Sequence, residues 1–253
     1  KYVNFLFKKL QREQGLLERD CDRMVRTDRI IWASCMVSCG DADGAVTGNT
    51  RRYGASLEKI SKVIDPRPGE IMFGLNMVVN KGKTVFVGDT SVNEYPSSEQ
   101  LAEIAISSAR VVRLFGFDPK VAFVSHSTFG QPLTSRTKHI KKAVDILKDK
   151  GVDFKFDGEM QPDVALNDEY KELYPFSEIV GNANILIMPG QHSAAISYKM
   201  MRELGGAKVI GPLLIGLGAP IEIAPLRSST SDILNLASVA AYSSGIINYN
   251  KKN

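Results

Sequence analysis

The chain has 253 residues, of which 43% are hydrophobic and 24% charged, and a formal net charge of +4. This length is enough to bury a core in one large domain or two smaller ones, and the composition is ordinary for a globular protein. Lysines and arginines are scattered among acidic residues, which argues against a nucleic-acid surface. No apolar run approaches the roughly 18 residues of a membrane span and no signal-peptide pattern is found, so a membrane partner is not expected.

The first part of the chain is predicted to be helical. Residues 1–9 have the pattern of a helix that begins earlier, and the chain does not start with Met, so we expect a fragment of a longer protein. Apolar residues at roughly helical spacing predict one continuous helix over 19–39. Its three cysteines, Cys21, Cys35 and Cys39, lack further cysteines or clustered histidines. They favour reduced thiols in a cytoplasmic protein over a zinc site.

A tight turn and three further elements follow. Asp41 and Asp43 in this turn could hold a metal, but aspartates in turns more often bond to nearby backbone N–H groups, so we expect no metal site. A helix is expected next, and it is followed by a hairpin because two β-rich runs flank a Lys-Gly-Lys turn. The ranges are 50–64 for the helix and 71–79 with 84–88 for the hairpin.

The middle of the chain alternates helices and strands. Ser97 and Gln100 have the spacing of a capping box, which predicts the start of a helix that runs to about residue 115. The next predicted elements are a strand over 120–124, a helix over 135–150, strands over 154–156 and 184–188, and a helix over 194–204.

Two polar loops follow buried strands in this region. One is Ser125-His126-Ser127-Thr128-Phe129-Gly130, and the other is Pro189-Gly190-Gln191-His192-Ser193. A strand, a loop of hydroxyls and glycine, and then a helix is the general plan of an anion-binding turn. The first loop lacks the lysine of a Walker loop and the glycine spacing of a dinucleotide loop. By itself it favours an ordinary capped helix.

The last part of the chain contains two short strands and a helix. The strands are predicted over 209–215 and 221–224, and the helix from about Ser229 to residue 242, after which the chain is expected to fray. The Ser/Thr-rich loop at the start of this helix suits an anionic ligand, because free N–H groups and the helix dipole point outward there. Strands that alternate with long helices predict a mostly parallel α/β fold.

Motifs along nearly the whole chain resemble one enzyme family. They read GDADGAVTGNTR, VFVGDTSVNEYPSSEQLAEIAISSA, VAFVSHSTFGQP, KFDGEMQPDVAL, NANILIMPGQHSAAISYKM and ELGGAKVIGPLLIGL. These stretches resemble the phosphate acetyltransferase (phosphate acetyl/butyryl transferase) family. In particular they are similar to the phosphotransacetylase-like domain at the C-terminus of bacterial NADP-dependent malic enzymes.

The resemblance implies two three-layer α/β lobes with an interdomain cleft, a phosphotransacetylase-like fold of the isocitrate/isopropylmalate dehydrogenase type. By analogy residues 1–68 and 214–253 form the first lobe, which lacks its N-terminal part, and residues 69–213 form the second. Because the family is commonly dimeric, a homo-oligomer is expected.

The resemblance also implies a site for acetyl-CoA or CoA. Asp232 aligns with the family's catalytic aspartate, the base that takes the proton of the CoA thiol. Asp232 is equally suited to cap its helix, because Ser229 and Asp232 have capping-box spacing. Lone His192 could be structural, and Lys199 could be a solvated surface residue. The residues that the resemblance places at the ligand are Ser125, Ser127, Thr128, Gly130, Pro189, His192, Ser193, Tyr198 and Lys199.

The phosphate chemistry of the family is degraded. Pro225 and Leu226 stand where the family has a serine and an arginine, and Glu58 stands where an arginine is expected. Proline and leucine side chains bind no phosphate, and a glutamate repels it. Arg227 or Arg51 could compensate if the loop register were shifted.

Three functions remain open. The first is a regulatory acetyl-CoA-binding domain of an NADP-dependent malic enzyme, whose NADP and divalent metal would belong to a catalytic domain that this chain does not contain. The second is an active phosphate acetyl/butyryltransferase with Asp232 as the base. The third is a scaffold that only mediates oligomerisation.

Overall fold

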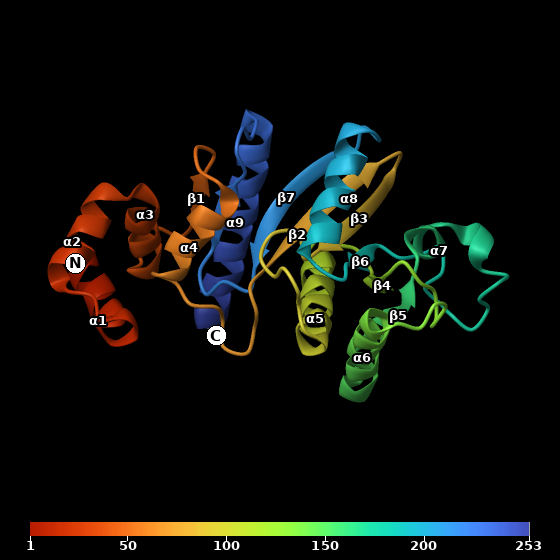
Figure 1. The fold of residues 1–253 in the computed structure, drawn as a ribbon. Coiled ribbons are helices and arrows are strands. Elements are labelled where there is room, and N and C mark those ends of the chain that lie inside the picture. The colour runs from red at the N-terminus through yellow and green to blue at the C-terminus, as the bar shows by residue number, and fades with distance from the viewer. Residues whose placement is uncertain (253) are drawn as a thin grey trace. The chain divides into compact units, whose positions relative to one another are not determined.

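The computed structural model describes residues 1–252, with side chains described up to Gly245. The chain forms two compact units (Figure 1): unit 1 comprises Lys1–Met72 and Gly211–Asn253, and unit 2 comprises Phe73–Ile210. The resemblance led us to expect divisions at 68/69 and 213/214. No helix among the described residues is both long and apolar enough to cross a membrane.

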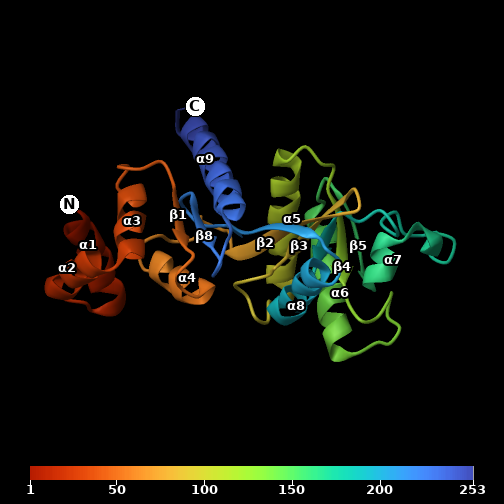
Figure 2. The same cartoon turned by 90° about the horizontal axis from the view of Figure 1, so that it is seen from above.

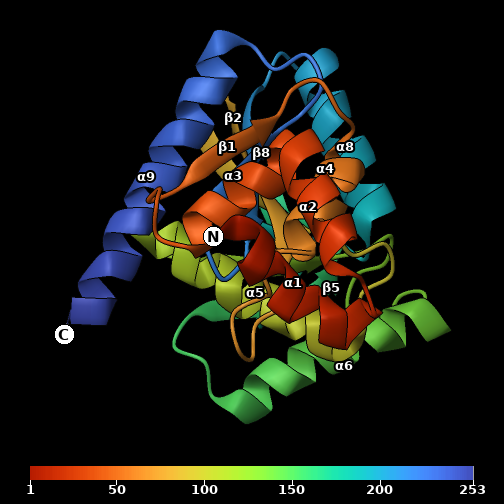
Figure 3. The ribbon, with the colours of Figure 1, turned by 90° about the vertical axis from the view of Figure 1, so that its left-hand side faces the viewer.

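Unit 1 packs helices around a two-stranded parallel sheet. The strands are β1 (Ala45–Gly48) and β8 (Ile221–Ala224), with Ala45 opposite Ile221. Figure 3 shows α9 on one side of this pair and α3 and α4 on the other. A side chain at Gly48 would collide with the backbone oxygen of Ala224, so the close approach of β1 and β8 requires glycine at this position. The helices are α1 (Tyr2–Gln14), α2 (Glu18–Thr27), α3 (Arg29–Ser38), α4 (Tyr53–Ser61) and α9 (Thr230–Lys252).

The prediction of a single helix over 19–39 is wrong, because the helix is interrupted at Asp28. The backbone of Asp28 is extended (φ −116°, ψ 109°), so α2 ends and α3 begins there. The Asp28 carboxylate accepts hydrogen bonds from the backbone N–H groups of Ile30 and Ile31, at 2.9 and 3.4 Å. An aspartate N-cap explains the break, and the helical periodicity concealed it.

Unit 2 is built on a mostly parallel sheet of strand order β5-β4-β6-β3-β2-β7. The edge strand β7 begins in unit 2, and its residues from Gly211 onward are assigned to unit 1. β4 pairs in parallel with β5 and β6, β6 in parallel with β3, and the predicted hairpin of β2 with β3 is confirmed as antiparallel. The strands are β2 (Phe73–Asn80), β3 (Lys83–Gly88), β4 (Lys120–Val124), β5 (Lys155–Met160), β6 (Ile185–Ile187) and β7 (Lys208–Ile215).

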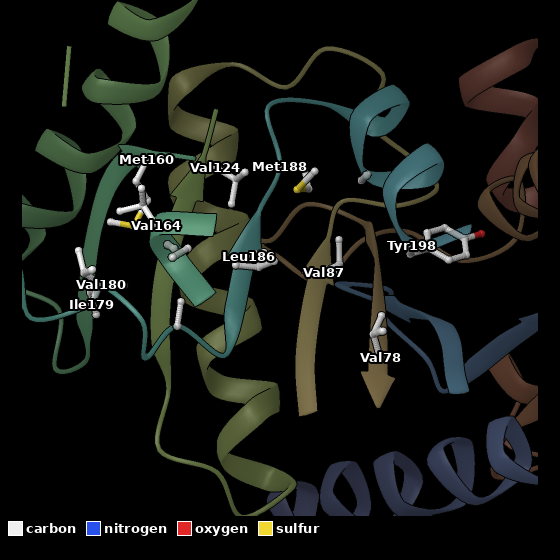
Figure 4. Packing of buried hydrophobic residues seen from close by; sticks show 14 of the residues in the cluster. Val78, Val87, Val124, Met160, Val164, Ile179, Val180, Leu186, Met188 and Tyr198 are labelled. Atoms are coloured by element: carbon white, nitrogen blue, oxygen red, sulfur yellow. The ribbon is translucent and has the colours of Figure 1, made fainter. Parts of the chain in front are cut away.

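Helices cover both faces of this sheet. A Cβ built on Gly88 would touch Ile104 of α5 on one face, whereas neighbouring Val87 belongs to the core on the other face with Tyr198 of α8. Figures 2 and 3 show α5 and α8 on opposite faces of the sheet. Figure 4 shows Val87, Leu186 and Val124, which belong to the core and lie on adjacent strands. The helices are α5 (Ser98–Leu114), α6 (Ser135–Lys150), α7 (Pro162–Leu166) and α8 (Gln191–Glu203), with a 3₁₀ turn at Asp168–Tyr170.

Several element boundaries differ from the predictions. The strand expected over 154–156 extends to Met160, and the helix expected over 194–204 begins at Gln191. The helix expected to end at about residue 242 runs on to Lys252. Serines and a single glycine there cost a helix only about 1 kcal/mol or less each, so they need not end it.

Candidate functional site

Four parallel strands end at one edge of the unit 2 sheet. β5, β4, β6 and β3 are neighbours that run in the same direction, so the loops after Met160, Val124, Ile187 and Gly88 emerge side by side. Ligands of open α/β sheets bind outside the carboxyl ends of such strands. We call this set of loops the strand-end edge, and both polar loops identified from the sequence belong to it.

The loop after β4 is held by a buried carboxylate. Glu159, only 1% exposed, accepts hydrogen bonds from the Gly130 N–H at 2.6 Å and from the Ser127 hydroxyl at 3.2 Å. Its backbone oxygen accepts from the Phe129 N–H at 2.8 Å. Glu159 therefore fixes the course of the loop. Sequence reasoning missed it, although its Asp-Gly-Glu motif lies in a stretch that carries the resemblance.

The hydroxyl groups of this loop form hydrogen bonds within the protein. Ser127 is fully buried, and Thr128 Oγ1 accepts from the backbone N–H of Gln161 at 3.2 Å. Ser125 is also buried, and its backbone N–H donates to Met160. The hydroxyls predicted to face a ligand thus shape the loop, and Gly130 and His126 remain its more accessible members.

The loop after β6 is shorter than expected, because α8 begins at Gln191. His192 and Ser193 consequently lie in the first turn of the helix, next to Pro189 and Gly190. His192 Nε2 lies 3.0 Å from a carboxylate oxygen of Glu94, and its ring stacks on Tyr95 at 5.9 Å between centroids. These contacts join the loops after β6 and β3 at the strand-end edge.

Tyr198 and Lys199 differ in environment. Tyr198 is 9% exposed within the core of Figure 4, and burial raises the pKa of its hydroxyl. The ammonium of Lys199 lies 5.8 Å from the centre of the Tyr198 ring. Tyr198 has the position of a core residue that supports α8, whereas Lys199 remains a candidate contact for an anion.

Asp232 in unit 1 forms the predicted helix cap. Its carboxylate accepts from the Ser229 N–H and the Ser229 hydroxyl, both at 2.8 Å, and the Ser229 hydroxyl accepts from the Asp232 N–H at 3.2 Å. Ser229 is exposed and Asp232 is partly buried. This reciprocal pair is a complete capping box, so a structural role explains Asp232 without any ligand.

The arginines that could compensate for lost phosphate binding are constrained. Arg51 donates to Asp28 at 2.8 Å, and Lys59 pairs with the same carboxylate oxygen. Glu58 is exposed and paired with Lys62 at 3.1 Å, and Leu226 is also exposed. Arg227 has a left-handed backbone (φ 63°), an uncommon conformation for a residue with a side chain. Arg51 is thus already occupied by a protein carboxylate.

No group of three or more histidines, cysteines, aspartates and glutamates in the described part of the chain is placed to hold a metal ion. Asp41, considered for that role, accepts instead from Lys1 Nζ and the Tyr2 hydroxyl, at 2.7 and 2.8 Å. Cys21 and Cys35 are buried free thiols, and burial raises the pKa of Cys35 to about 12.

Comparisons with known proteins agree with the resemblance. A NADP-dependent malic enzyme of Rhizobium meliloti is 48% identical over 96% of this chain, which spans about a third (32%) of that relative. A phosphate acetyltransferase of Clostridium acetobutylicum is 33% identical, with 92% of this chain and 72% of the relative covered. A phosphotransacetylase structure from Streptococcus pyogenes matches with a TM-score of 0.89 and 28% identity over 96% of this chain and 75% of that one. The family model described as phosphate acetyl/butaryl transferase matches residues 1–241, and the chain belongs to that family.

Proposed function

We propose that this chain is the phosphotransacetylase-like part of an NADP-dependent malic enzyme and binds acetyl-CoA or CoA as a regulatory ligand. The observation that carries the proposal is the strand-end edge of unit 2, where four loops converge at the place at which α/β sheets bind ligands. The similarity to malic enzymes over 96% of the chain supports the assignment to that branch.

The ligand is proposed to lie along the loops after β4 and β6. Gly130 presents backbone close to the ligand, and Ser127 and Thr128 hold that backbone in place. His192 and Lys199 supply polar and cationic groups on α8. Cations suit the phosphates of CoA, because an ammonium forms charge-assisted hydrogen bonds with phosphate oxygens.

Loss of transferase chemistry is the second part of the proposal. Asp232 is engaged in its own helix cap and Arg51 in an ion pair with Asp28. Pro225 and Leu226 provide neither a hydroxyl nor a guanidinium. A missing donor to a developing negative charge typically costs a factor of about 10²–10³ in rate. Binding without turnover is the expected behaviour.

The proposal extends to the surroundings of the chain. We place the protein in the cytoplasm, consistent with its buried free thiols, as a homo-oligomer attached to a malic enzyme domain in the same polypeptide. In this arrangement NADP and a divalent metal belong to the malic enzyme domain, and acetyl-CoA bound here alters its activity.

The deciding experiment measures binding and turnover on one sample. Acetyl-CoA binding is followed by calorimetry, and phosphate-dependent loss of its thioester is followed by absorbance. We expect binding without thioester loss. Thioester loss would make the protein a transferase, and a folded protein that binds no CoA ester would leave only the scaffold function.

The alternative, an active phosphate acetyl/butyryltransferase, is favoured by the similarity to the Clostridium acetobutylicum enzyme. Asp232→Asn separates the two functions. In a transferase this change removes the base and abolishes turnover while the fold persists. In a regulatory domain it weakens only a helix cap, by about 1 kcal/mol.

Lys199 provides a local test of the ligand position. Lys199→Glu reverses a charge on α8 and should weaken acetyl-CoA binding if this lysine faces the CoA phosphates. Unchanged affinity would remove Lys199 from the proposed contacts.

A further inference from the structure

An exposed cluster of aromatic rings lies directly beside the proposed acyl-CoA loop. Phe129, the residue before Gly130, packs against Tyr174 with ring centroids 5.4 Å apart and against Phe176 at 4.8 Å. Phe129 and Tyr174 are partly buried and rest on the unit 2 core. Phe176 is 68% exposed. We call these three rings the aromatic cluster.

The backbone of the loop is held so that Phe129 reaches this cluster. Phe129 has a left-handed conformation (φ 47°), which is rare for a residue with a bulky side chain. The Phe129 N–H donates to the Glu159 backbone oxygen, and the next N–H, that of Gly130, donates to the Glu159 carboxylate. An uncommon conformation fixed by a buried carboxylate is typical of a site where an exact side-chain position matters.

Apolar and cationic residues follow Gly130 along the chain. Leu133 is 57% exposed and lies next to Gly130. Arg136 and Lys138, in the first turn of α6, are exposed, and neither forms an ion pair with another residue of the described chain. An exposed ring on this loop, together with unpaired cations on the helix that follows the loop, is a combination suited to a nucleotide, because the base stacks and the phosphates need positive charge.

We propose that the aromatic cluster stacks the adenine ring of acyl-CoA, with Phe176 as the accessible ring and Arg136 and Lys138 beside the phosphates. This inference rests on the proposed function and adds the position of the nucleotide end of the ligand. Phe176 packs against two further rings, so the cluster offers a contiguous aromatic face, which suits a flat base.

The experiment compares Phe176→Ala with wild-type protein by calorimetry, using the full chain and three ligands. Acetyl-CoA carries both ends of the ligand, S-acetylpantetheine lacks the nucleotide, and adenosine 3′,5′-bisphosphate is the nucleotide alone. Since a stacked base is worth roughly 1–3 kcal/mol, Phe176→Ala should weaken binding of acetyl-CoA and of the bisphosphate by about 5- to 150-fold. Binding of S-acetylpantetheine should stay unchanged.

Two control variants complete the design. Phe176→Tyr keeps a ring and should restore affinity. Leu114→Ala removes a side chain that is 47% exposed at the end of α5, which precedes the start of β4 and therefore lies at the sheet edge opposite the strand-end edge. Leu114→Ala should bind all three ligands as the wild type does.

The outcomes separate this inference from the proposed function. Wild-type affinity for acetyl-CoA in Phe176→Ala overturns the adenine subsite and leaves acyl-CoA binding intact. Wild-type protein that binds the bisphosphate through Phe176 but shows no gain in affinity with acetyl-CoA overturns the acyl-CoA function and retains a nucleotide subsite. A wild type that binds neither overturns both. A changed oligomeric state of Phe176→Ala in sedimentation, with unchanged affinity, would assign the aromatic cluster to a protein contact instead.

Discussion

At the scale of single residues, Asp28 lies between α2 and α3 in unit 1 and forms ion pairs with two cationic side chains. One carboxylate oxygen caps α3, and the other meets Arg51 and Lys59. Burial alone would raise the pKa of Asp28, but the bonds from Lys59, Arg51 and two backbone N–H groups outweigh it and lower the pKa to about 2. The folded state therefore prefers the charged form.

Asp28→Asn should destabilise unit 1 in a pH-dependent way. The pKa is lowered on folding, so the stabilisation is present above about pH 4 and is lost as the pH falls toward 2. One pKa unit corresponds to about 1.4 kcal/mol, so we expect a loss of about 2 kcal/mol at pH 7. Urea unfolding at pH 7 and pH 3 measures this difference, which should shrink at pH 3.

Asp22→Asn is the matched control for this prediction. Asp22 also pairs with an arginine, Arg26 at 2.8 Å, but on the exposed surface of α2. Exposed pairs contribute little, about 0–1 kcal/mol. Equal losses of unfolding free energy in the two variants would contradict the prediction, because burial of Asp28 would then add nothing to the stability that its ion pairs provide.

Glu222 presents the opposite case, a carboxylate that folding keeps neutral. It lies on β8, is only 4% exposed, and accepts a hydrogen bond from the Leu214 N–H at 2.9 Å. Burial raises its pKa from 4.5 to about 8, an effect that the Leu214 N–H only partly offsets. Folding therefore retains a proton that the unfolded chain releases above about pH 4.5.

Glu222→Gln should stabilise the protein at alkaline pH. Because the folded pKa is raised, the wild type loses stability as the pH rises from about 4.5 to 8, by an amount on the order of 5 kcal/mol. Glutamine resembles the neutral acid and has no such loss. Chemical denaturation should give similar stabilities at pH 5 and a more stable variant at pH 9. The same pH dependence in both proteins would mean that Glu222 is charged in the folded state, and Glu58→Gln, at an exposed site, serves as the control.

At the scale of elements, the loop after β4 depends on a residue of β5. Glu159→Ala leaves the Gly130 N–H without its acceptor and leaves the Ser127 hydroxyl with only Ser125 Oγ, 3.3 Å away. Each unsatisfied buried group costs about 1–3 kcal/mol, so we expect a loss of roughly 2–4 kcal/mol and weaker acetyl-CoA binding. Glu159→Gln keeps an acceptor oxygen and should lose less on both measures. Thermal unfolding and calorimetry on the two variants test this order, and equal losses would contradict it.

Elements with local signals were predictable from the sequence. The capping box of Ser97 and Gln100 forms as expected at the start of α5, and the Lys81-Gly82-Lys83 turn closes the hairpin of β2 and β3. Both signals act within a few residues, so they need no knowledge of the fold. The fold class and family followed from the resemblance and are confirmed.

Features that depend on distant contacts were not predictable. Asp28 was missed because its cap interrupts an apolar pattern that continues across it, and its partners Arg51 and Lys59 come from later in the chain. Glu159 was missed because its task is to bind backbone and a hydroxyl some 30 positions earlier. For the same reason Ser127 was predicted as a ligand contact, although the structure buries it. A polar residue after a strand can face a ligand or a neighbour, and only tertiary structure separates these cases.

At the scale of the whole molecule, each unit buries apolar residues of its own. The core cluster around Val87 and Tyr198 draws all its members from unit 2. Leu6, Leu10 and Cys21 are fully buried on helices of unit 1. A unit with its own core can unfold as its own cooperative step.

Trp32 makes this separation measurable, because it is the single tryptophan of the chain and lies on α3 of unit 1, against Tyr2. We expect Asp28→Asn to move the urea transition followed by tryptophan fluorescence. Glu159→Ala, in unit 2, should leave that transition in place and move a transition seen by far-UV circular dichroism, which reports on both units. Acetyl-CoA, if it binds only the loops of unit 2, should shift the second transition alone, since a ligand stabilises what it binds. If instead both probes shift together in both variants, the chain unfolds as one cooperative unit, and ligand binding at the strand-end edge would stabilise unit 1 as well.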